Sequence, residues 1–269
     1  MKESRYCLEK EYAMEASGRD HSDAGSFKTL FNGCKSGSTG LEATPDYLYS
    51  EKAAYRIKNE IPGAKIVFIL REPVDRLTSW FRFARMNGLI PGSMSFDEYV
   101  QLQRSGNAED APQHLKALEQ GNYFKYIDHY VKLFGTESVL VCFYEQLSDD
   151  PLTFCKEVCR FAGLDAGYFE HFDFRIFNRT SDTKSTLLHK MFRKFKRGIR
   201  PATRLLPGSL RKRLKLAGHT LEESVIRMNS AEVPVHSSAA TMNFLNEYYS
   251  SGIRQLSGHY RIPERWRHS

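Results

Sequence analysis

Arg71 and Ser79 are the residues whose types and spacing first suggest chemistry. Arg71 follows five consecutive apolar residues, Ile66–Leu70, and Pro73 comes two positions later. This pattern predicts a strand buried on both sides, a tight turn and a helix that begins at the proline. Open α/β sheets bind anions at such a junction, because the helix N–H groups and macrodipole point there. We therefore expect the Arg71 guanidinium and the Ser79 hydroxyl to bind an anion; an ion pair between Arg71 and Asp75 is the alternative.

Other segments predict the elements that position this junction. Helix, strand and helix alternate along the chain, as an α/β architecture with a parallel sheet requires. The expected elements are an extended segment over 42–49, helices over 50–61, 96–102, 123–134 and 150–161, a second buried strand over 139–144, and a last helix that carries residues 242–256. We expect them to form a single domain over residues 1–269.

Composition limits the classes of function. The 269 residues are 41% hydrophobic and 26% charged, which is ordinary for a globular protein. The net charge of +7 favours an anionic ligand or surface over a cationic one. The five cysteines are an odd number and no C-x-x-C pair occurs, so we expect reduced thiols and no metal site. The sequence contains neither an apolar run of about 20 residues, which would span a bilayer, nor a signal-peptide pattern.

A basic stretch follows the expected α/β elements. No acidic residue occurs between Thr183 and Leu221, and Leu and Phe side chains recur among the Lys and Arg residues. The pattern predicts a basic amphipathic helical segment at about 185–217. Three interpretations remain open: a solvated helix face, a rim that attracts a polyanionic glycan, or peripheral contact with an anionic membrane. No nucleic-acid motif occurs, so we do not expect nucleic acid as a partner.

Taken together, these motifs resemble the sulfotransferases that use 3′-phosphoadenosine 5′-phosphosulfate (PAPS). The resemblance is to the carbohydrate branch, which includes the heparan sulfate sulfotransferases and bacterial relatives. It is carried by LEATPDYLYS, KIVFILREPVDRLTSWF, GNYFKYIDHYVKLFGTESVLVCFYEQLSDDP and FNRTSDTKS. It implies a three-layer α/β/α fold with a central parallel sheet, of the P-loop NTPase-like type. It also implies that Arg71 and Ser79 bind the 3′-phosphate of PAPS.

The resemblance assigns further roles. Glu3, in the pair Lys2-Glu3, matches the glutamate that acts as general base on an acceptor hydroxyl, and Lys2 lies beside it on the acceptor side. Glu42 and Tyr47 fall in the acceptor-side segment, where Tyr47 stacks on a sugar ring or belongs to the core. The loop predicted to close over the nucleotide supplies three further candidates, Arg179, Thr180 and Lys184.

The sequence departs from the family in one respect. Members carry a first strand and a phosphate loop of the type Pro-Lys-x-Gly-Thr-Thr, which should precede Glu3, so about 30 residues are expected to be missing. Residues 34–39 (CKSGST) imitate the loop, but a poor strand precedes them and Pro45 leaves no room for the helix. Alternatives are therefore a degenerate, non-catalytic nucleotide-binding member, or a basic module that binds a polyanion or membrane. We expect a cytoplasmic protein, or one of the Golgi lumen if an anchor precedes Met1.

Overall fold

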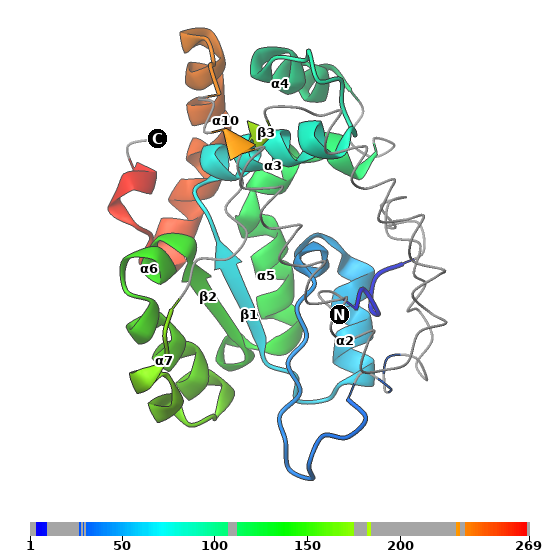
Figure 1. Ribbon diagram of the computed structural model, residues 1–269, viewed down its shortest axis with the longest axis vertical. Helices are drawn as coiled ribbons and strands as arrows, with labels where there is room; N and C mark the ends of the chain where they lie inside the picture. The colour runs from blue at the N-terminus through cyan, green and yellow to red at the C-terminus, as the bar shows by residue number, and fades with distance from the viewer. Residues whose placement is uncertain are drawn as a thin grey trace.

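The computed structural model describes residues 4–9, 27, 29, 31–106, 112–174, 182–183, 230–231 and 235–267 (Figure 1). Its strands are β1 (Ile66–Leu70), β2 (Val139–Phe143), β3 (Asp182–Thr183) and β4 (Ser230–Ala231). β1 and β2 pair in parallel, from Ile66 opposite Val139 to Leu70 opposite Phe143, whereas β3 and β4 are antiparallel. A parallel pair needs a long crossover, which α3, α4 and α5 provide here. The predicted α/β class with a parallel sheet is confirmed.

Local sequence signals set the helix bounds. The α-helices are α2 (Glu51–Glu60), α3 (Pro73–Asn87), α4 (Phe96–Ser105), α5 (Tyr123–Phe134), α6 (Tyr144–Asp149), α7 (Pro151–Ala162) and α10 (Ala239–His259). The 3-10 helices are η2 (Pro45–Tyr49), η3 (Gln113–Leu115), η4 (Glu119–Gly121), η5 (Thr136–Ser138), η6 (Ala166–His171) and η7 (Glu264–Arg267). The Ser50 side chain caps α2 by accepting a hydrogen bond from Ala53 N at 3.0 Å. Gly163 ends α7 at φ 74°, a left-handed conformation that glycine adopts without strain.

Two local expectations were wrong. The segment over 42–49 is not extended throughout, because its second half forms η2, where Tyr47 N donates to Thr44 O at 3.1 Å. Pro45 excludes an α-helix interior but suits the first position of a short 3-10 turn. β1 is also not buried on both faces, since Ile69 is 51% exposed among the described residues.

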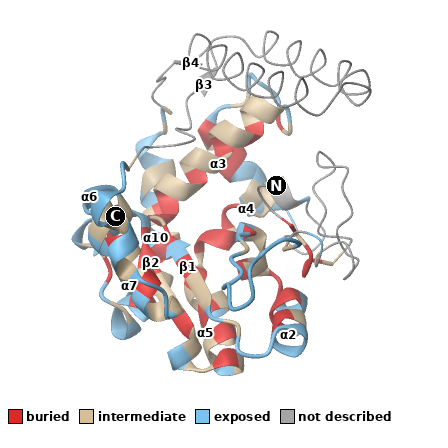
Figure 2. Ribbon diagram, turned by 60° about the horizontal axis from the view of Figure 1, so that its bottom comes forward, coloured by how far each residue is buried: buried red, intermediate tan, exposed pale blue. Residues whose placement is uncertain are grey.

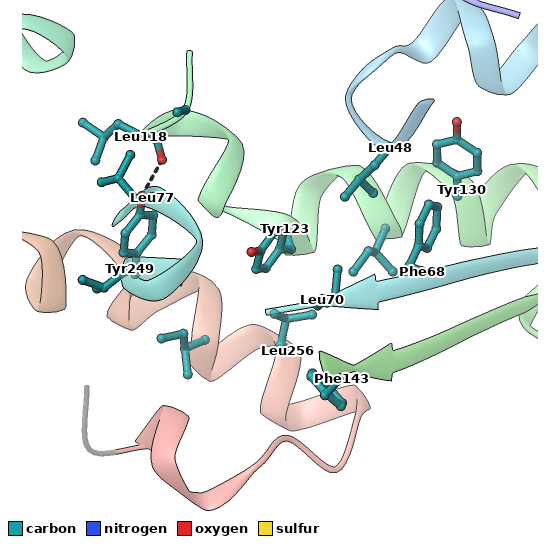
Figure 3. Packing of buried hydrophobic residues seen from close by; sticks show 14 of the residues in the cluster. Leu48, Phe68, Leu70, Leu77, Leu118, Tyr123, Tyr130, Phe143, Tyr249 and Leu256 are labelled. Carbon is teal, nitrogen blue, oxygen red and sulfur yellow. Dashed lines mark hydrogen bonds between the residues drawn. The ribbon is translucent and has the colours of Figure 1, made fainter. Parts of the chain in front are cut away.

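The hydrophobic core lies between the β1–β2 sheet and the helices that pack against it, α5 among them. Figure 2 shows buried segments on α2, α3 and α5. Phe68 of β1 meets Tyr130 of α5 edge to face, with ring centroids 5.0 Å apart. At the carboxyl ends of the strands, Trp266 of η7 is fully buried and packs against Phe143, with ring centroids 5.1 Å apart. Figure 3 shows the hydrogen bond from the Tyr249 hydroxyl to Leu118 O, which is 2.8 Å long and joins α10 to the segment before η4.

None of the helices in the described part of the chain is long and apolar enough to cross a lipid bilayer.

Candidate functional site

Arg71 lies immediately after β1, at the carboxyl end of the parallel sheet. Its side chain is 37% exposed, and its Nη2 lies 3.5 Å from Asp75 Oδ2. The guanidinium also lies 5.4 Å from the centroid of the Tyr144 ring, at the corresponding end of β2. Its Nε is buried and has no hydrogen-bond partner among the described residues. The ion pair with Asp75, the alternative interpretation of Arg71, is therefore present, but it leaves one buried N–H of Arg71 without an acceptor among the described residues.

Ser79 lies two turns into α3 and is partly buried. Asp75 and Ser79 are four residues apart, so they lie on neighbouring turns of the same helix face. Ser79 is thus one turn beyond the Arg71–Asp75 ion pair. Arg71 lies between β1 and α3, Ser79 lies on α3, and the amino end of α3 adds a positive partial charge. The role of the pair in phosphate binding stays a prediction.

Two buried carboxylates stand beside Arg71. Glu72 caps α3 by accepting a hydrogen bond from Asp75 N at 2.6 Å. Burial raises the pKa of Glu72, and the nearby carboxylates of Asp75 and Glu145 raise it further. Glu145, the second residue of α6, accepts hydrogen bonds through Oε1 from Glu72 N at 3.2 Å and from Arg265 Nη2 at 2.5 Å. The Glu145 carboxylate therefore joins the backbone at the end of β1 to η7.

Sequence reasoning missed Glu145 and Arg265. Glu145 follows a predicted strand, a position that often carries site residues, and this is the one signal that would have singled it out. Arg265 carries no local signal, because its partner is 120 residues away. Its guanidinium is more than half exposed and adds a second positive charge near the Arg71–Asp75 pair.

Arg76, the second arginine of the motif, has a different environment. Its Nε donates to the Tyr49 hydroxyl at 3.1 Å, its Nη1 to Ala117 O at 2.9 Å and its Nη2 to Gln120 Oε1 at 2.9 Å. With all three nitrogens engaged, Arg76 ties α3 to the segment before α5. It is a structural residue in this arrangement and not a phosphate ligand.

Glu42 and Tyr47, the two described candidates of the acceptor side, both contact Ser4. Glu42 Oε1 accepts from Ser4 Oγ at 2.6 Å and from Ser4 N at 3.2 Å. The Tyr47 hydroxyl lies 3.3 Å from Ser4 Oγ and accepts from Cys7 N at 3.1 Å. Burial raises the pKa of Tyr47 to about 12. Tyr47 packs against the core, and its hydroxyl holds the segment that follows Glu3.

Several predicted residues fall outside the described residues. They are Lys2, Glu3, Arg179, Thr180, Lys184 and the basic segment at about 185–217. Their predicted roles are neither supported nor opposed by the structure. In the described part of the chain, all five cysteines are free, and no group of three or more His, Cys, Asp or Glu side chains is arranged to hold a metal ion.

A groove of about 980 Å³ lies elsewhere on the molecule, between α4 and the start of α10. It begins at Pro91, beyond the carboxyl end of α3, whereas Arg71 precedes the amino end of that helix. Its lining includes Met94, Val100 and Phe244, and Arg104 stacks over Phe244 at 3.9 Å. We place the candidate site at the β1–α3 junction, because the groove contains neither of the anion candidates.

Comparison with known proteins identifies a family for this chain. Residues 55–201, more than half of the chain, match the family described as "Sulfotransferase domain". Mouse bifunctional heparan sulfate N-deacetylase/N-sulfotransferase 4 is 33% identical over 133 residues, which is 48% of this chain and 15% of that protein. Human heparan sulfate glucosamine 3-O-sulfotransferase 6 is 28% identical over 138 residues, 51% of this chain and 39% of that protein. The chain thus spans well under half the length of these relatives.

A solved structure shows the same fold. The sulfotransferase from Alicyclobacillus acidocaldarius superposes with a TM-score of 0.54 at 21% identity, over 74% of this chain and 80% of that chain. The matched family segment begins within α2 and contains β1, the candidate junction, α5 and β2. The chain belongs to the sulfotransferase domain family.

Proposed function

We propose that this protein transfers a sulfuryl group from PAPS to a hydroxyl or amine of a carbohydrate acceptor. Membership in the sulfotransferase family supports the reaction class, and the names of two matched relatives point to heparan sulfate as the kind of acceptor. The observation that carries the proposal is Arg71, which lies at the carboxyl end of the parallel sheet with a buried Nε that has no partner in the described part of the chain.

The residues at the junction fit the 3′-phosphate of PAPS. The Arg71 guanidinium already binds a carboxylate oxygen of Asp75, so an anionic oxygen is accepted at this place. The oxygens of a phosphate would accept hydrogen bonds both from Arg71 Nη2 and from its buried Nε. Ser79 adds a hydroxyl one turn further along α3. Arg265 lies nearby, with its guanidinium paired to Glu145 and more than half exposed. PAPS supplies the activated sulfuryl group, and the residues of this chain bind and orient its nucleotide end.

The remaining roles rest on the resemblance. Glu3 acts as general base towards the acceptor hydroxyl, with Lys2 beside it. Arg179, Thr180 and Lys184 contact the nucleotide from a closing loop. The contacts of Glu42 and Tyr47 with Ser4 support a role for both in holding the Lys2-Glu3 segment on the acceptor side.

Thermal unfolding with adenosine 3′,5′-bisphosphate tests the cofactor assignment. At a free concentration about ten times Kd, we expect the Tm to rise by about 3 °C. Arg71→Ala should remove most of this shift, whereas Arg104→Ala, which removes a guanidinium on α4, should leave it unchanged. If the unmutated protein shows no shift, the assignment is wrong; if Arg71→Ala shifts as the unmutated protein does, the role of Arg71 is wrong.

Transfer of radiolabelled sulfate from PAPS to N-deacetylated or N-acetylated heparosan then tests the reaction. A nucleotide-induced shift without transfer to any glycan would favour the non-catalytic alternative.

For the basic segment at about 185–217, we propose recruitment of a polyanionic acceptor. Binding to heparin that weakens with salt supports this role, and equal binding to anionic vesicles would point to the membrane.

A further inference from the structure

The peptide group that joins Arg71 to Glu72 is held by two buried side chains. Its carbonyl, Arg71 O, accepts a hydrogen bond of 2.8 Å from the Tyr123 hydroxyl. Its N–H, which belongs to Glu72, donates to Glu145 Oε1 at 3.2 Å. Tyr123 is only 2% exposed and Glu145 only 4%. Both polar groups of one peptide unit are therefore bonded to side chains, one from the first residue of α5 and one from α6.

These two side chains are themselves supported by η7. Arg265 Nη2 donates to the same Glu145 Oε1 at 2.5 Å. Trp266 is fully buried and lies against Tyr123, with ring centroids 6.2 Å apart. Figure 3 shows Tyr123 near the end of β1, close to Leu70. Burial raises the pKa of Tyr123 well above the usual value, so its hydroxyl keeps the proton that it donates.

The orientation of this peptide group sets how α3 is placed relative to the Arg71 side chain, which leaves the chain at the end of β1. Arg71 is the first residue after the β1 ladder, so no strand hydrogen bond limits the rotation of the peptide that follows it. Rotation of this unit changes ψ of Arg71 and φ of Glu72, and so changes the angle between the strand end and α3. Bonding both the C=O and the N–H to buried side chains removes this freedom, because turning the peptide would leave two polar groups unsatisfied.

We propose that Tyr123 and Glu145 are positioning residues that fix the Arg71–Glu72 peptide and thereby hold Arg71 and α3 in the relative arrangement that binds the 3′-phosphate of the nucleotide. The inference rests on the proposed function, in which Arg71 binds that phosphate. It adds that selectivity for the 3′-phosphate depends on two residues that do not touch the nucleotide.

The test compares the affinities for adenosine 3′,5′-bisphosphate and for adenosine 5′-monophosphate, which lacks the 3′-phosphate. The Kd for the monophosphate divided by the Kd for the bisphosphate measures recognition of the 3′-phosphate. A general loss of stability affects both Kd values and leaves this ratio unchanged. Tyr123→Phe should lower this ratio by about fivefold, since one hydrogen bond that fixes the Arg71–Glu72 peptide, and with it the placement of α3 relative to Arg71, is lost. Tyr130→Phe is the matched control, because it removes a hydroxyl of the same helix that bonds Tyr47 O at 2.6 Å, away from the junction.

Two substitutions of Glu145 test the proposal independently of Tyr123. Glu145→Ala removes the acceptor for Glu72 N–H and should lower the ratio as Tyr123→Phe does. Glu145→Gln keeps an acceptor oxygen and should restore most of the ratio, even though it loses the charge that pairs with Arg265. Circular dichroism verifies that each variant is folded, and the Glu145 pair carries the test if Tyr123→Phe does not fold.

The outcomes separate this inference from the function on which it rests. If the unmutated protein does not prefer the bisphosphate, or if Arg71→Ala keeps that preference, the proposed function is overturned. Suppose instead that Arg71→Ala loses the preference while Tyr123→Phe and Glu145→Ala show the same ratio as the control Tyr130→Phe. In that case only the positioning role is overturned. A ratio that falls equally in Glu145→Ala and Glu145→Gln would contradict the assignment of Glu145 as the peptide acceptor.

Discussion

Arg71 and Asp75 form an ion pair, with Nη2 and Oδ2 3.5 Å apart, at the place where the proposed function puts a phosphate. The two residues are four apart, and Asp75 is in the first turn of α3. Both side chains are more than one third exposed, so the pair contributes little to stability. A nucleotide phosphate must therefore compete with the Asp75 carboxylate for Arg71, and their like charges repel each other.

Removing this competitor should strengthen nucleotide binding. Asp75→Asn is expected to lower the Kd for adenosine 3′,5′-bisphosphate by about threefold, because Arg71 is freed and a negative charge is lost. The matched control is Asp128→Asn, which breaks an i,i+4 ion pair with Lys132 on α5. Titration calorimetry measures both. Weaker binding in Asp75→Asn would show that Asp75 orients Arg71 instead of competing for it.

Arg76 should be far more important for stability than Arg71. Its three hydrogen bonds reach Tyr49, Ala117 O and Gln120 from a half-buried position. Arg76→Lys keeps the charge but cannot reproduce this fork, and we expect a loss of about 3 kcal/mol in the free energy of unfolding. Denaturant unfolding measures the loss. Arg85→Lys, on the same helix, should cost less than about 1 kcal/mol, and similar losses in the two variants would contradict the structural role of Arg76.

Glu72 should make stability fall as the pH rises. Its pKa in the folded protein is raised by burial, so the folded protein holds this proton more tightly than the unfolded chain does. The carboxylate therefore opposes folding above the folded pKa, and this penalty disappears below the usual glutamate pKa of about 4.3. Glu72→Gln, which keeps an acceptor for the helix cap, should raise the Tm at pH 7 and have little effect near pH 4.

Glu98 is a control of opposite sign for this measurement. Hydrogen bonds from Ser95 lower the pKa of Glu98, so its carboxylate favours folding above the usual pKa and loses this effect as the pH falls. Glu98→Gln should therefore lower the Tm at pH 7, with a difference that shrinks on acidification. If Glu72→Gln and Glu98→Gln change the Tm in the same direction at pH 7, the assignment for Glu72 is wrong.

Thiol reactivity should separate the cysteines by environment. Cys34 is exposed, whereas burial raises the pKa of Cys7 to about 11 and that of Cys142 to about 12. At pH 8 the two buried thiols are almost entirely protonated, so iodoacetamide should modify Cys34 first. Peptide mass spectrometry follows each site, and the same reaction in guanidinium chloride should modify all three alike. Early modification of Cys7 would mean that the segment around Ser4 is not held by Tyr47 as described.

The elements around the junction were predictable because their signals are local. A proline at the first turn set the start of α3, a serine cap set that of α2, and Gly135 ended α5 as expected. Arg71 could be singled out for the same reason, since the strand, the arginine and the proline are adjacent. The roles assigned to Arg71 and Ser79 stay predictions until a nucleotide is tested.

The supports of the site could not be predicted in this way. Glu145 meets Glu72 and Arg265 only after folding, and a sequence pattern with a period of two or 3.6 residues does not contain contacts over such separations. Arg76 is likewise held by partners that are distant in the sequence, Tyr49, Ala117 O and Gln120. Tertiary packing, and not local preference, decides which arginine of the motif remains available for a ligand.

The packing of η7 against the sheet end has a consequence for biosynthesis. Arg265 and Trp266 are needed to cover Glu145 and Tyr123, yet the ribosome makes them more than 120 residues after Phe143. A nascent chain that ends at α7 already has both parallel strands but lacks the side chains that cover Glu145 and Tyr123. We therefore expect the nucleotide site to mature late, when η7 docks, rather than when its own strand and helix emerge.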